Sequence, residues 1–387
     1  MDIREQLCGA ILNEEKIGNY KKAEALKKSA FFRYGGWKRR IRKTITVMSK
    51  FRKNKNNNPR VAVFIQDNVD LIKAISEYFD VIVVNPPIKL AVQYLKKGIE
   101  VGYTSGKIDK FFRELYEKKI DIHIKKELTK IQRKLLKAQC KIMIFPDDME
   151  MIFRLYILAG RNAGIKSITI QHGMMDFNIT PAIGRFTDYF FVWGKKYCEL
   201  YEPEKKDNIF VMGYPYKVDW DKIEYKYTGN RVLFIGQPIS EKSYDEIVEN
   251  VYNACQTTGK KLCYRLHPSE NHDKLKDRYS KLANMQYSEG NLEDDIVNSA
   301  VVIGLFSTVL LQALIYNKRV IQIDCGYKGL DFTKMGNVCR VNLDYEEIVG
   351  ALQKKTCNNK QIELNEEYLL LNKNYARDVV QFIKEKQ

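Results

Sequence analysis

The sequence predicts an α/β protein with two doubly wound domains that face one another across a cleft, preceded by a basic helical N-terminal extension. Three observations predict it. The chain has 387 residues, which is long for a single hydrophobic core. Short apolar runs alternate with helical patterns, as in parallel sheets that carry helices on both faces. The alternation stops once, near residue 225, and then begins again. We therefore expect boundaries that give residues 1–59, 60–225 and 226–387.

The first domain is predicted from buried, strand-like runs that follow the linker KNKNNNP. Its strands are expected at 61–66, 81–85, 140–145, 166–171, 188–194 and 208–213. A long charged helical region is expected at about 107–138. In the second domain the strands are expected at 231–236, 261–266, 300–304 and 319–324, with amphipathic helices between them and one more at the C-terminus.

Composition restricts the class of protein. Hydrophobic residues make up 45% and charged residues 29% of the chain, as in a globular protein. No apolar run reaches the roughly 18 residues of a membrane-spanning helix. The first twenty residues lack the basic-then-apolar order of a secretory signal. Single, scattered cysteines without a CxxC pair indicate reduced thiols in the cytoplasm and make a disulfide framework or a zinc site an unlikely interpretation.

The net charge of +17 is concentrated in one segment. Residues 1–60 contain 17 Lys and Arg against five acids, a balance of +12, which leaves +5 for the rest of the chain. In this segment Trp37, Lys38, Arg39 and Arg40 stand beside further aromatic and basic residues. Aromatic and cationic side chains together favour an anionic membrane surface. A solvated basic helix face is the plainer alternative, and nucleic acid is a third, although no known nucleic-acid-binding module follows.

Polar residues at predicted strand ends indicate a ligand site, because open α/β sheets bind ligands at the carboxyl ends of their strands. The run VVIGLFSTVLLQAL places Gly304 after a strand, and Ser307 and Thr308 where a helix begins. Such a helix start binds phosphate, and hydroxyl groups add donors. Simple capping by Ser307 is the structural alternative. In YRLHPSE, His267 ends the neighbouring strand and can donate to the same phosphate, with Arg265 as a weaker candidate.

The first domain supplies candidates for a general base. His172 follows the strand at 166–171, and Asp147 and Asp148 follow the strand at 140–145. Either a histidine or a carboxylate at such a strand end can deprotonate an acceptor hydroxyl. A satisfied imidazole and an N-cap are the respective structural alternatives.

Other chemistries are not indicated. Asp219-Trp220-Asp221 has the spelling of a DxD metal motif but lies between the domains, so we expect no metal. The chain has no GxGxxG or P-loop lysine motif, which argues against dehydrogenases and kinases.

Taken in order, QHG, GYP, RLHP and GLFSTVLLQAL resemble motifs of bacterial GT-B glycosyltransferases of surface-polysaccharide assembly. The resemblance is to the sialyltransferase and polysialyltransferase group, and it extends to the CDP-glycerol glycerophosphotransferases of teichoic acid synthesis through His172-Gly173. It covers about residues 140–325 and none of the basic extension.

This resemblance implies metal-independent transfer from a nucleotide-activated donor without a cofactor. His267, Ser307 and Thr308 would bind the donor phosphate, and Gly304, Gln237 and Arg265 complete the expected donor-binding set. The sialyltransferase pattern makes Asp147 or Asp148 the base, whereas the glycerophosphotransferase pattern makes it His172. The last helix is expected to cross back to the first domain.

These inferences favour a peripheral glycosyltransferase at the cytoplasmic face of the membrane that builds a capsule or lipopolysaccharide glycan. Its expected partners are a nucleotide sugar, preferably cytidine-linked such as CMP-sialic acid, a glycan or lipid-linked acceptor, and an anionic membrane, without nucleic acid. A CDP-polyol phosphotransferase is the nearest alternative. A non-enzymatic scaffold that binds a membrane or RNA is the second.

Overall fold

The protein is described by a computed structural model, in which two compact units are distinguished. The described residues are 2–20, 23, 24, 27, 59–64, 68–104, 107–175, 183–223, 225, 227–237, 241–267, 270, 272–283, 285–324, 331–354 and 364–387. The first unit comprises residues 1–172, 180–217 and 370–387, and the second comprises 173–179 and 218–369. The boundary between the two units lies at 217/218, eight residues before the boundary expected at 225/226. The C-terminal residues 370–387 belong to the first unit.

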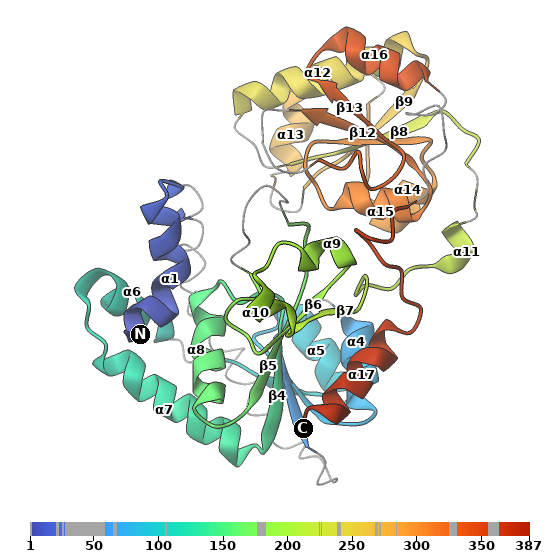
Figure 1. Ribbon diagram of the computed structural model, residues 1–387. Coiled ribbons are helices and arrows are strands. Elements are labelled where there is room, and N and C mark those ends of the chain that lie inside the picture. Colours follow the sequence, from blue (N-terminus) through green and yellow to red (C-terminus); the bar gives the residue numbers. More distant parts are fainter. Residues whose placement is uncertain are drawn as a thin grey trace. The chain divides into compact units, whose positions relative to one another are not determined.

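The described strands of the first unit form one parallel sheet (Figure 1). They are β1 (Arg60–Val63), β2 (Asp80–Val84), β3 (Glu100–Gly102), β4 (Cys140–Phe145), β5 (Lys166–Ile170), β6 (Tyr189–Val192) and β7 (Ile209–Val211). Their order is β3-β2-β1-β4-β5-β6-β7. The strand order reverses at β1, which lies between β2 and β4. The central strands are mostly apolar because helices cover both of their faces.

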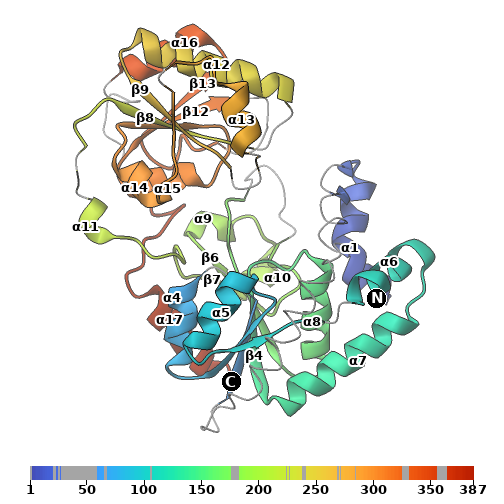
Figure 2. The same ribbon diagram turned by 180° about the vertical axis from the view of Figure 1, so that it is seen from behind.

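Helices cover both faces of this sheet, and Figures 1 and 2 show the two groups on opposite sides. One face carries α4 (Val69–Ser76), α5 (Ile88–Lys96) and α17 (Tyr375–Glu385). The other carries α1 (Ile3–Lys16), α6 (Ile108–Lys118), α7 (Ile122–Lys137) and α8 (Met151–Arg161). Two short helices, α9 (Lys195–Cys198) and α10 (Pro203–Lys206), lie between β6 and β7. The return of α17 agrees with the expected crossing of the last helix.

Helix α1 belongs to the core of the first unit. Leu7, Cys8 and Ile11 are buried in the cluster that also contains residues of α6, α7 and α8. Arg4 donates to the Tyr116 carbonyl, and Arg154 of α8 donates to the Gln6 carbonyl. The segment 1–59, expected as a separate extension, therefore begins with a helix that stabilises the first domain.

The second unit has a parallel sheet of the same winding. Its described strands are β8 (Arg231–Ile235), β9 (Lys261–Arg265), β10 (Gln286–Tyr287), β11 (Val301–Gly304), β12 (Arg319–Asp324) and β13 (Val338–Asn342). Its helices are α11 (Trp220–Ile223), α12 (Glu241–Thr257), α13 (His272–Arg278), α14 (Leu292–Val297), α15 (Val309–Ile315) and α16 (Tyr345–Gln353). The order β10-β9-β8-β11-β12-β13 reverses at β8, which lies between β9 and β11.

The strands that sequence patterns missed are edge strands. β3, β10 and β13 lie at sheet edges. Each is short or exposes alternate side chains, so none forms a continuous buried apolar run. The charged region predicted at 107–138 is two helices, because the chain turns at Lys119, which has a left-handed φ of 56°.

Two further expectations concern cysteines and membrane spans. Among the described cysteines, Cys8, Cys140, Cys198, Cys255 and Cys263 are free thiols. Cys339 of β13 is disulfide-bonded, which differs from the expectation of reduced thiols throughout. Within the described ranges, no helix is both long and apolar enough to cross a bilayer.

Candidate functional site

The first unit brings two predicted segments to one sheet edge. Pro146 and Asp147 follow β4, and His172 follows β5. β4 and β5 are parallel neighbours, so their carboxyl ends lie at the same edge. Nδ1 of His172 lies 2.7 Å from the carbonyl oxygen of Pro146. This hydrogen bond ties the ends of the two strands together.

The same hydrogen bond fixes the tautomer of the neutral His172 ring, that is, which of its two nitrogens carries the hydrogen. A carbonyl oxygen only accepts, so Nδ1 carries the hydrogen and donates it. In the neutral imidazole the proton is then absent from Nε2, which keeps its lone pair. The side chain of His172 is exposed, so Nε2 can take a proton from a hydroxyl group. Sequence patterns gave no signal for Pro146, because its contribution is a backbone carbonyl.

Gln171, the residue before His172, holds this turn in place from the protein interior. It is fully buried, its side-chain Oε1 accepts from the Trp193 amide at 2.9 Å, and its carbonyl accepts from the Trp193 indole at 2.8 Å. Two hydrogen bonds to one buried tryptophan hold the residue that precedes His172. Gln171 therefore acts through the position of its neighbour.

The neighbouring aspartates have different environments. Oδ1 of Asp147 accepts from the amides of Met149 and Glu150, at 2.9 and 3.2 Å, directly before α8. These bonds close a local Asx-type turn before the helix, whose N-cap residue is Glu150. Asp147 is only partly buried, so a catalytic role for it stays a prediction.

Asp148 is a structural residue. Its carboxylate has no exposed surface. Oδ1 accepts from the Gly184 amide at 2.7 Å, and Oδ2 accepts from the amides of Phe186 and Thr187 at 2.5 and 3.2 Å. Burial raises the pKa of Asp148, against the opposing effect of the Phe186 and Gly184 hydrogen bonds. A carboxylate with both oxygens engaged and no access to solvent is unsuited to deprotonate an acceptor, which corrects the expectation that Asp148 competes for the role of base.

In the second unit, Gln237 connects the two strands at the point where strand order reverses. It follows β8, and its Oε1 accepts from the Phe306 amide, in the loop after β11, at 3.1 Å. Its own amide donates to the Tyr244 hydroxyl at 2.7 Å. Open α/β sheets bind ligands at this reversal point. The structure therefore places Gln237 in the expected region, where it orients the loop that leads to Ser307.

Ser307 and Thr308 lie immediately before α15. Oγ of Ser307 accepts from the Val309 amide at 3.3 Å, and the Ser307 and Thr308 carbonyls accept from the first residues of the helix. Ser307 thus accepts from the first amide of the helix, but the N-cap position is that of Thr308, whose side chain makes no capping hydrogen bond. Both residues are partly exposed. Gly304 has a packing reason, because a Cβ there would come within 3.0 Å of Leu310 Cδ2. Phosphate binding by these residues stays a prediction.

His267 lies at the end of β9, beside β8, and is half-buried. Its amide donates to Oε2 of Glu270 at 2.5 Å, and the Glu270 amide donates to the His267 carbonyl at 2.9 Å. Glu270 therefore closes the turn that presents His267. The only sequence signal for Glu270 is its position three residues after His267, which is the spacing of a capped turn. Its carboxylate also lies close to the backbone of Gly236, where a Cβ would be 2.7 Å from Oε2.

Arg265 belongs to a charge network instead of the strand-end group. Its guanidinium donates to Asp295 at 2.5 Å and to the Gly290 carbonyl at 2.9 Å. Arg231 pairs with the same carboxylate at 2.7 Å. Burial raises the pKa of Asp295, but hydrogen bonds from Ser288, Arg231 and Arg265 outweigh that effect and lower it. This geometry favours a structural role for Arg265.

The remaining predictions concern the membrane and metal. Trp37, Lys38, Arg39 and Arg40 lie outside the described residues, so their role stays a prediction. Within the described ranges, no three His, Cys, Asp or Glu side chains gather where they can hold a metal ion. The absence of a metal requirement likewise stays a prediction.

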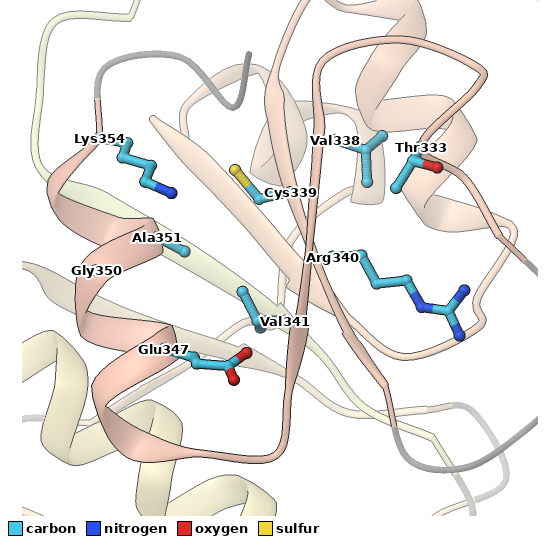
Figure 3. A pocket seen from close by; sticks show the side chains of 9 residues that line it. All are labelled: Thr333, Val338, Cys339, Arg340, Val341, Glu347, Gly350, Ala351 and Lys354. Atoms are coloured by element: carbon cyan, nitrogen blue, oxygen red, sulfur yellow. The ribbon is translucent and has the colours of Figure 1, made fainter.

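A pocket of about 430 Å³ lies in another part of the second unit (Figure 3). It is formed by β13, α16 and the residues next to them, and it includes none of the predicted site residues. Arg340 of its wall pairs with Asp324 at 2.6 Å, and Glu347 accepts from Asn342. Its main polar groups are therefore already engaged, and we do not assign it a role in catalysis.

Comparisons with known proteins bear on the fold and the class of enzyme. A family model for alpha-2,8-polysialyltransferase matches residues 195–325, about a third of the chain. This stretch includes His267, Gly304, Ser307 and Thr308. No curated protein matches the chain.

Solved structures of UDP-GlcNAc 2-epimerases and of MurG are similar in fold. The UDP-GlcNAc 2-epimerase of Methanocaldococcus jannaschii has a TM-score of 0.59 and 12% identity, over 84% of this chain and 99% of that one. The Neisseria meningitidis UDP-GlcNAc 2-epimerase bound to UDP-GlcNAc has a TM-score of 0.56 and 13% identity, over 84% and 100%. MurG of Acinetobacter baumannii has a TM-score of 0.52 and 11% identity, over 84% and 99%.

These likenesses confirm the predicted fold class, with two Rossmann-like domains of the GT-B type. The match of residues 195–325, most of which belong to the second unit, to a polysialyltransferase family supports a glycosyltransferase. The expected cleft between the domains stays a prediction.

Proposed function

We propose that this chain is a glycosyltransferase that transfers a sugar from a nucleotide-activated donor, preferably CMP-sialic acid, to a glycan acceptor of a bacterial capsule or lipopolysaccharide. One observation carries the proposal: the polysialyltransferase family match covers the part of a GT-B chain that contains His267 and the turn before α15. The match to a polysialyltransferase family supports sialic acid as the transferred sugar, and the resemblance of the sequence motifs to sialyltransferases favours its cytidine-linked form as the donor. The nucleotide sugars bound in the fold's relatives support a nucleotide-linked donor more generally.

His172 is the base in this proposal. Nε2 takes the proton of the acceptor hydroxyl, whose oxygen forms a bond to the anomeric carbon of the donor. The bond from that carbon to the phosphate oxygen breaks, and the nucleotide leaves with the electron pair. The support is the hydrogen bond from Nδ1 to Pro146, which leaves Nε2 as the acceptor on an exposed ring. Both carboxylate oxygens of Asp148 accept hydrogen bonds, and Asp147 accepts hydrogen bonds from the turn before α8.

His267, Ser307 and Thr308 are proposed to bind the donor phosphate, with Gln237 as a positioning residue. Gln237 holds the amide of Phe306, one residue before Ser307, and thus sets the path of this loop. The reaction is proposed to need no metal or cofactor. We place the enzyme at the cytoplasmic face of the membrane, where the basic segment around Lys38–Arg40 would favour anionic lipid.

A CDP-polyol phosphotransferase is the second candidate, because the assignment of His172 as base fits the glycerophosphotransferase pattern better than an aspartate base does. The two candidates differ in their products. A glycosyltransferase forms a glycosidic bond and releases CMP, whereas the phosphotransferase forms a phosphodiester and also releases CMP.

The test begins with thermal stabilisation of the full chain by CMP, CDP, UDP and GDP. We expect CMP or CDP to raise the unfolding temperature, with UDP and GDP weaker. At 100 times its dissociation constant, a nucleotide stabilises the folded state by about 2.7 kcal/mol. Product analysis with CMP-sialic acid and an oligosaccharide acceptor follows. Stabilisation by UDP alone, with epimerisation of UDP-GlcNAc, would overturn the proposal in favour of the activity of the fold relatives. No response to any nucleotide would favour a non-enzymatic scaffold.

A further inference from the structure

Helix α7 (Ile122–Lys137) presents a cationic surface that the proposed chemistry does not use. Its inner face, with Ile124, Ile131 and Leu135, is buried in the core of the first unit. Its exposed face carries six cations and no carboxylate: Lys125, Lys126, Lys130, Arg133, Lys134 and Lys137. The acidic residue within α7, Glu127, is buried and pairs with Lys130 at 3.2 Å.

Four of these cations form one stripe along the helix. Residues 126, 130, 133 and 137 are separated by four, three and four positions, which places them on the same side of an α-helix. With a rise of 1.5 Å per residue, the stripe is roughly 16 Å long. Lys126, Arg133 and Lys137 have no acidic partner among the residues that the structure describes. The stripe therefore retains most of its charge for an external anion.

Exposed aliphatic side chains lie at both ends of the stripe. Ile120, in the turn before α7, is 42% exposed, and Ile122, four residues before Lys126, is 53% exposed. Leu136, beside Lys137, is 52% exposed. The first two follow Lys119, whose left-handed backbone brings the chain from α6 into α7. Large aliphatic groups in water gain free energy when an apolar phase covers them.

We propose that the exposed face of α7, together with the turn at Ile120, docks onto an anionic lipid bilayer. The cations contact headgroup phosphates and the aliphatic ends enter the boundary between headgroups and acyl chains, as in helices that lie in the plane of a membrane surface. Single-stranded nucleic acid would instead be expected to meet aromatic stacking platforms, and α7 exposes no phenylalanine, tyrosine or tryptophan. This surface is distinct from the basic segment near Lys38, and the inference does not depend on the proposed catalytic activity.

The test uses the full chain and vesicles of phosphatidylcholine with or without phosphatidylserine. The triple variant Lys126→Gln, Arg133→Gln, Lys137→Gln removes the unpaired cations and leaves the basic segment unchanged. Each cation near an anionic surface changes binding about fivefold, so the partition coefficient for phosphatidylserine vesicles should fall about 100-fold. The loss should shrink as salt is added, because screening weakens the attraction in the unmodified chain.

A matched control removes equal charge from the opposite face of the same sheet. The control variant changes three exposed lysines on and directly after α5, the helix that packs with α4 and α17 on the other face. Its substitutions are Lys89→Gln, Lys96→Gln and Lys97→Gln. This control should retain vesicle binding within a few-fold. A third variant, Ile122→Ser with Leu136→Ser, should lower the binding that persists at high salt.

Three outcomes would overturn the inference. In the first, the triple variant would bind phosphatidylserine vesicles as well as the unmodified chain does, which would mean that the basic segment accounts for all binding. In the second, the α5 control would lose as much vesicle binding as the α7 variant, which would mean that net charge alone determines binding. In the third, the α7 variant would lose binding to RNA and keep binding to vesicles, which would mean that the stripe binds nucleic acid.

Discussion

Asp148→Asn should destabilise the first domain strongly, whereas Asp147→Asn should have little effect. Asp148 accepts three backbone hydrogen bonds, from Gly184 at one oxygen and from Phe186 and Thr187 at the other. An asparagine side chain retains one accepting oxygen, so its NH2 group must face at least one of these N–H donors. Asp147 uses one oxygen, which asparagine can reproduce.

The magnitude follows from the bonds that are lost. A hydrogen bond to a charged group contributes about 1.5–3 kcal/mol, and a buried donor left unpaired costs about 1–3 kcal/mol. If the asparagine oxygen keeps Phe186 and Thr187, the Gly184 bond is lost and the free energy of unfolding falls by about 3 kcal/mol. For Asp147→Asn the two bonds are kept, and we expect a change within about 0.5 kcal/mol, as at ordinary surface positions.

Two measurements check this prediction. Urea unfolding gives the change in stability, and hydrogen exchange of the peptide that contains residues 183–187 reports the loop directly. The amides of Gly184, Phe186 and Thr187 should exchange faster in Asp148→Asn and normally in Asp147→Asn. Equal stability of the two variants, or unchanged exchange in this peptide, would refute the structural role of Asp148. Loss of turnover in a fully folded Asp148→Asn would instead return Asp148 to the chemistry.

The remaining predictions concern catalysis, the N-terminal helix and a buried lysine. His172→Ala should lower turnover by about 10²–10⁴ and leave the affinity for the donor nucleotide unchanged. His267→Ala should lower both turnover and this affinity; kinetics and nucleotide titration measure the two quantities. Leu7→Ala in α1 should lower the stability of the first domain by about 2–5 kcal/mol in urea unfolding, and a neutral result would mean that α1 is dispensable. Burial lowers the pKa of Lys318 from 10.5 to about 8, so its charged form costs stability below pH 8 and this cost disappears as pH rises towards 10.5. Lys318→Met should therefore gain stability relative to the unmodified chain at pH 7, and the gain should shrink by pH 10; a constant difference would contradict the shifted pKa.

The central strands could be predicted because each is a local property of the chain. Runs such as 140–145 and 231–235 are buried on both faces, so their apolar composition is visible without knowledge of their neighbours. The edge strands β3, β10 and β13 lack this signal, since each is short or leaves alternate side chains exposed. β13 illustrates this, with Arg340 and Asn342 exposed between buried residues.

The candidate site was predictable in position and only partly in role. Strand ends are set by local signals such as Pro268 after His267 and Gly304 before Ser307, and parallel strands bring these ends to one edge. The sequence allowed His172 and the pair Asp147 and Asp148 as candidates for the base. Both aspartate and histidine can remove a proton, so composition and spacing do not identify the base.

Sequence by itself determined the two alternating domains, the buried strands and the edge of each sheet where polar residues gather. Tertiary structure decided which of those residues are available for chemistry. The amides that engage Asp148 come from residues 184–187, and the carbonyl that orients His172 comes from Pro146. These partners are separated by 26 to 39 positions in the chain. A hydrogen bond at that separation depends on how strands and loops pack, and only folding brings its donor and acceptor within hydrogen-bonding distance.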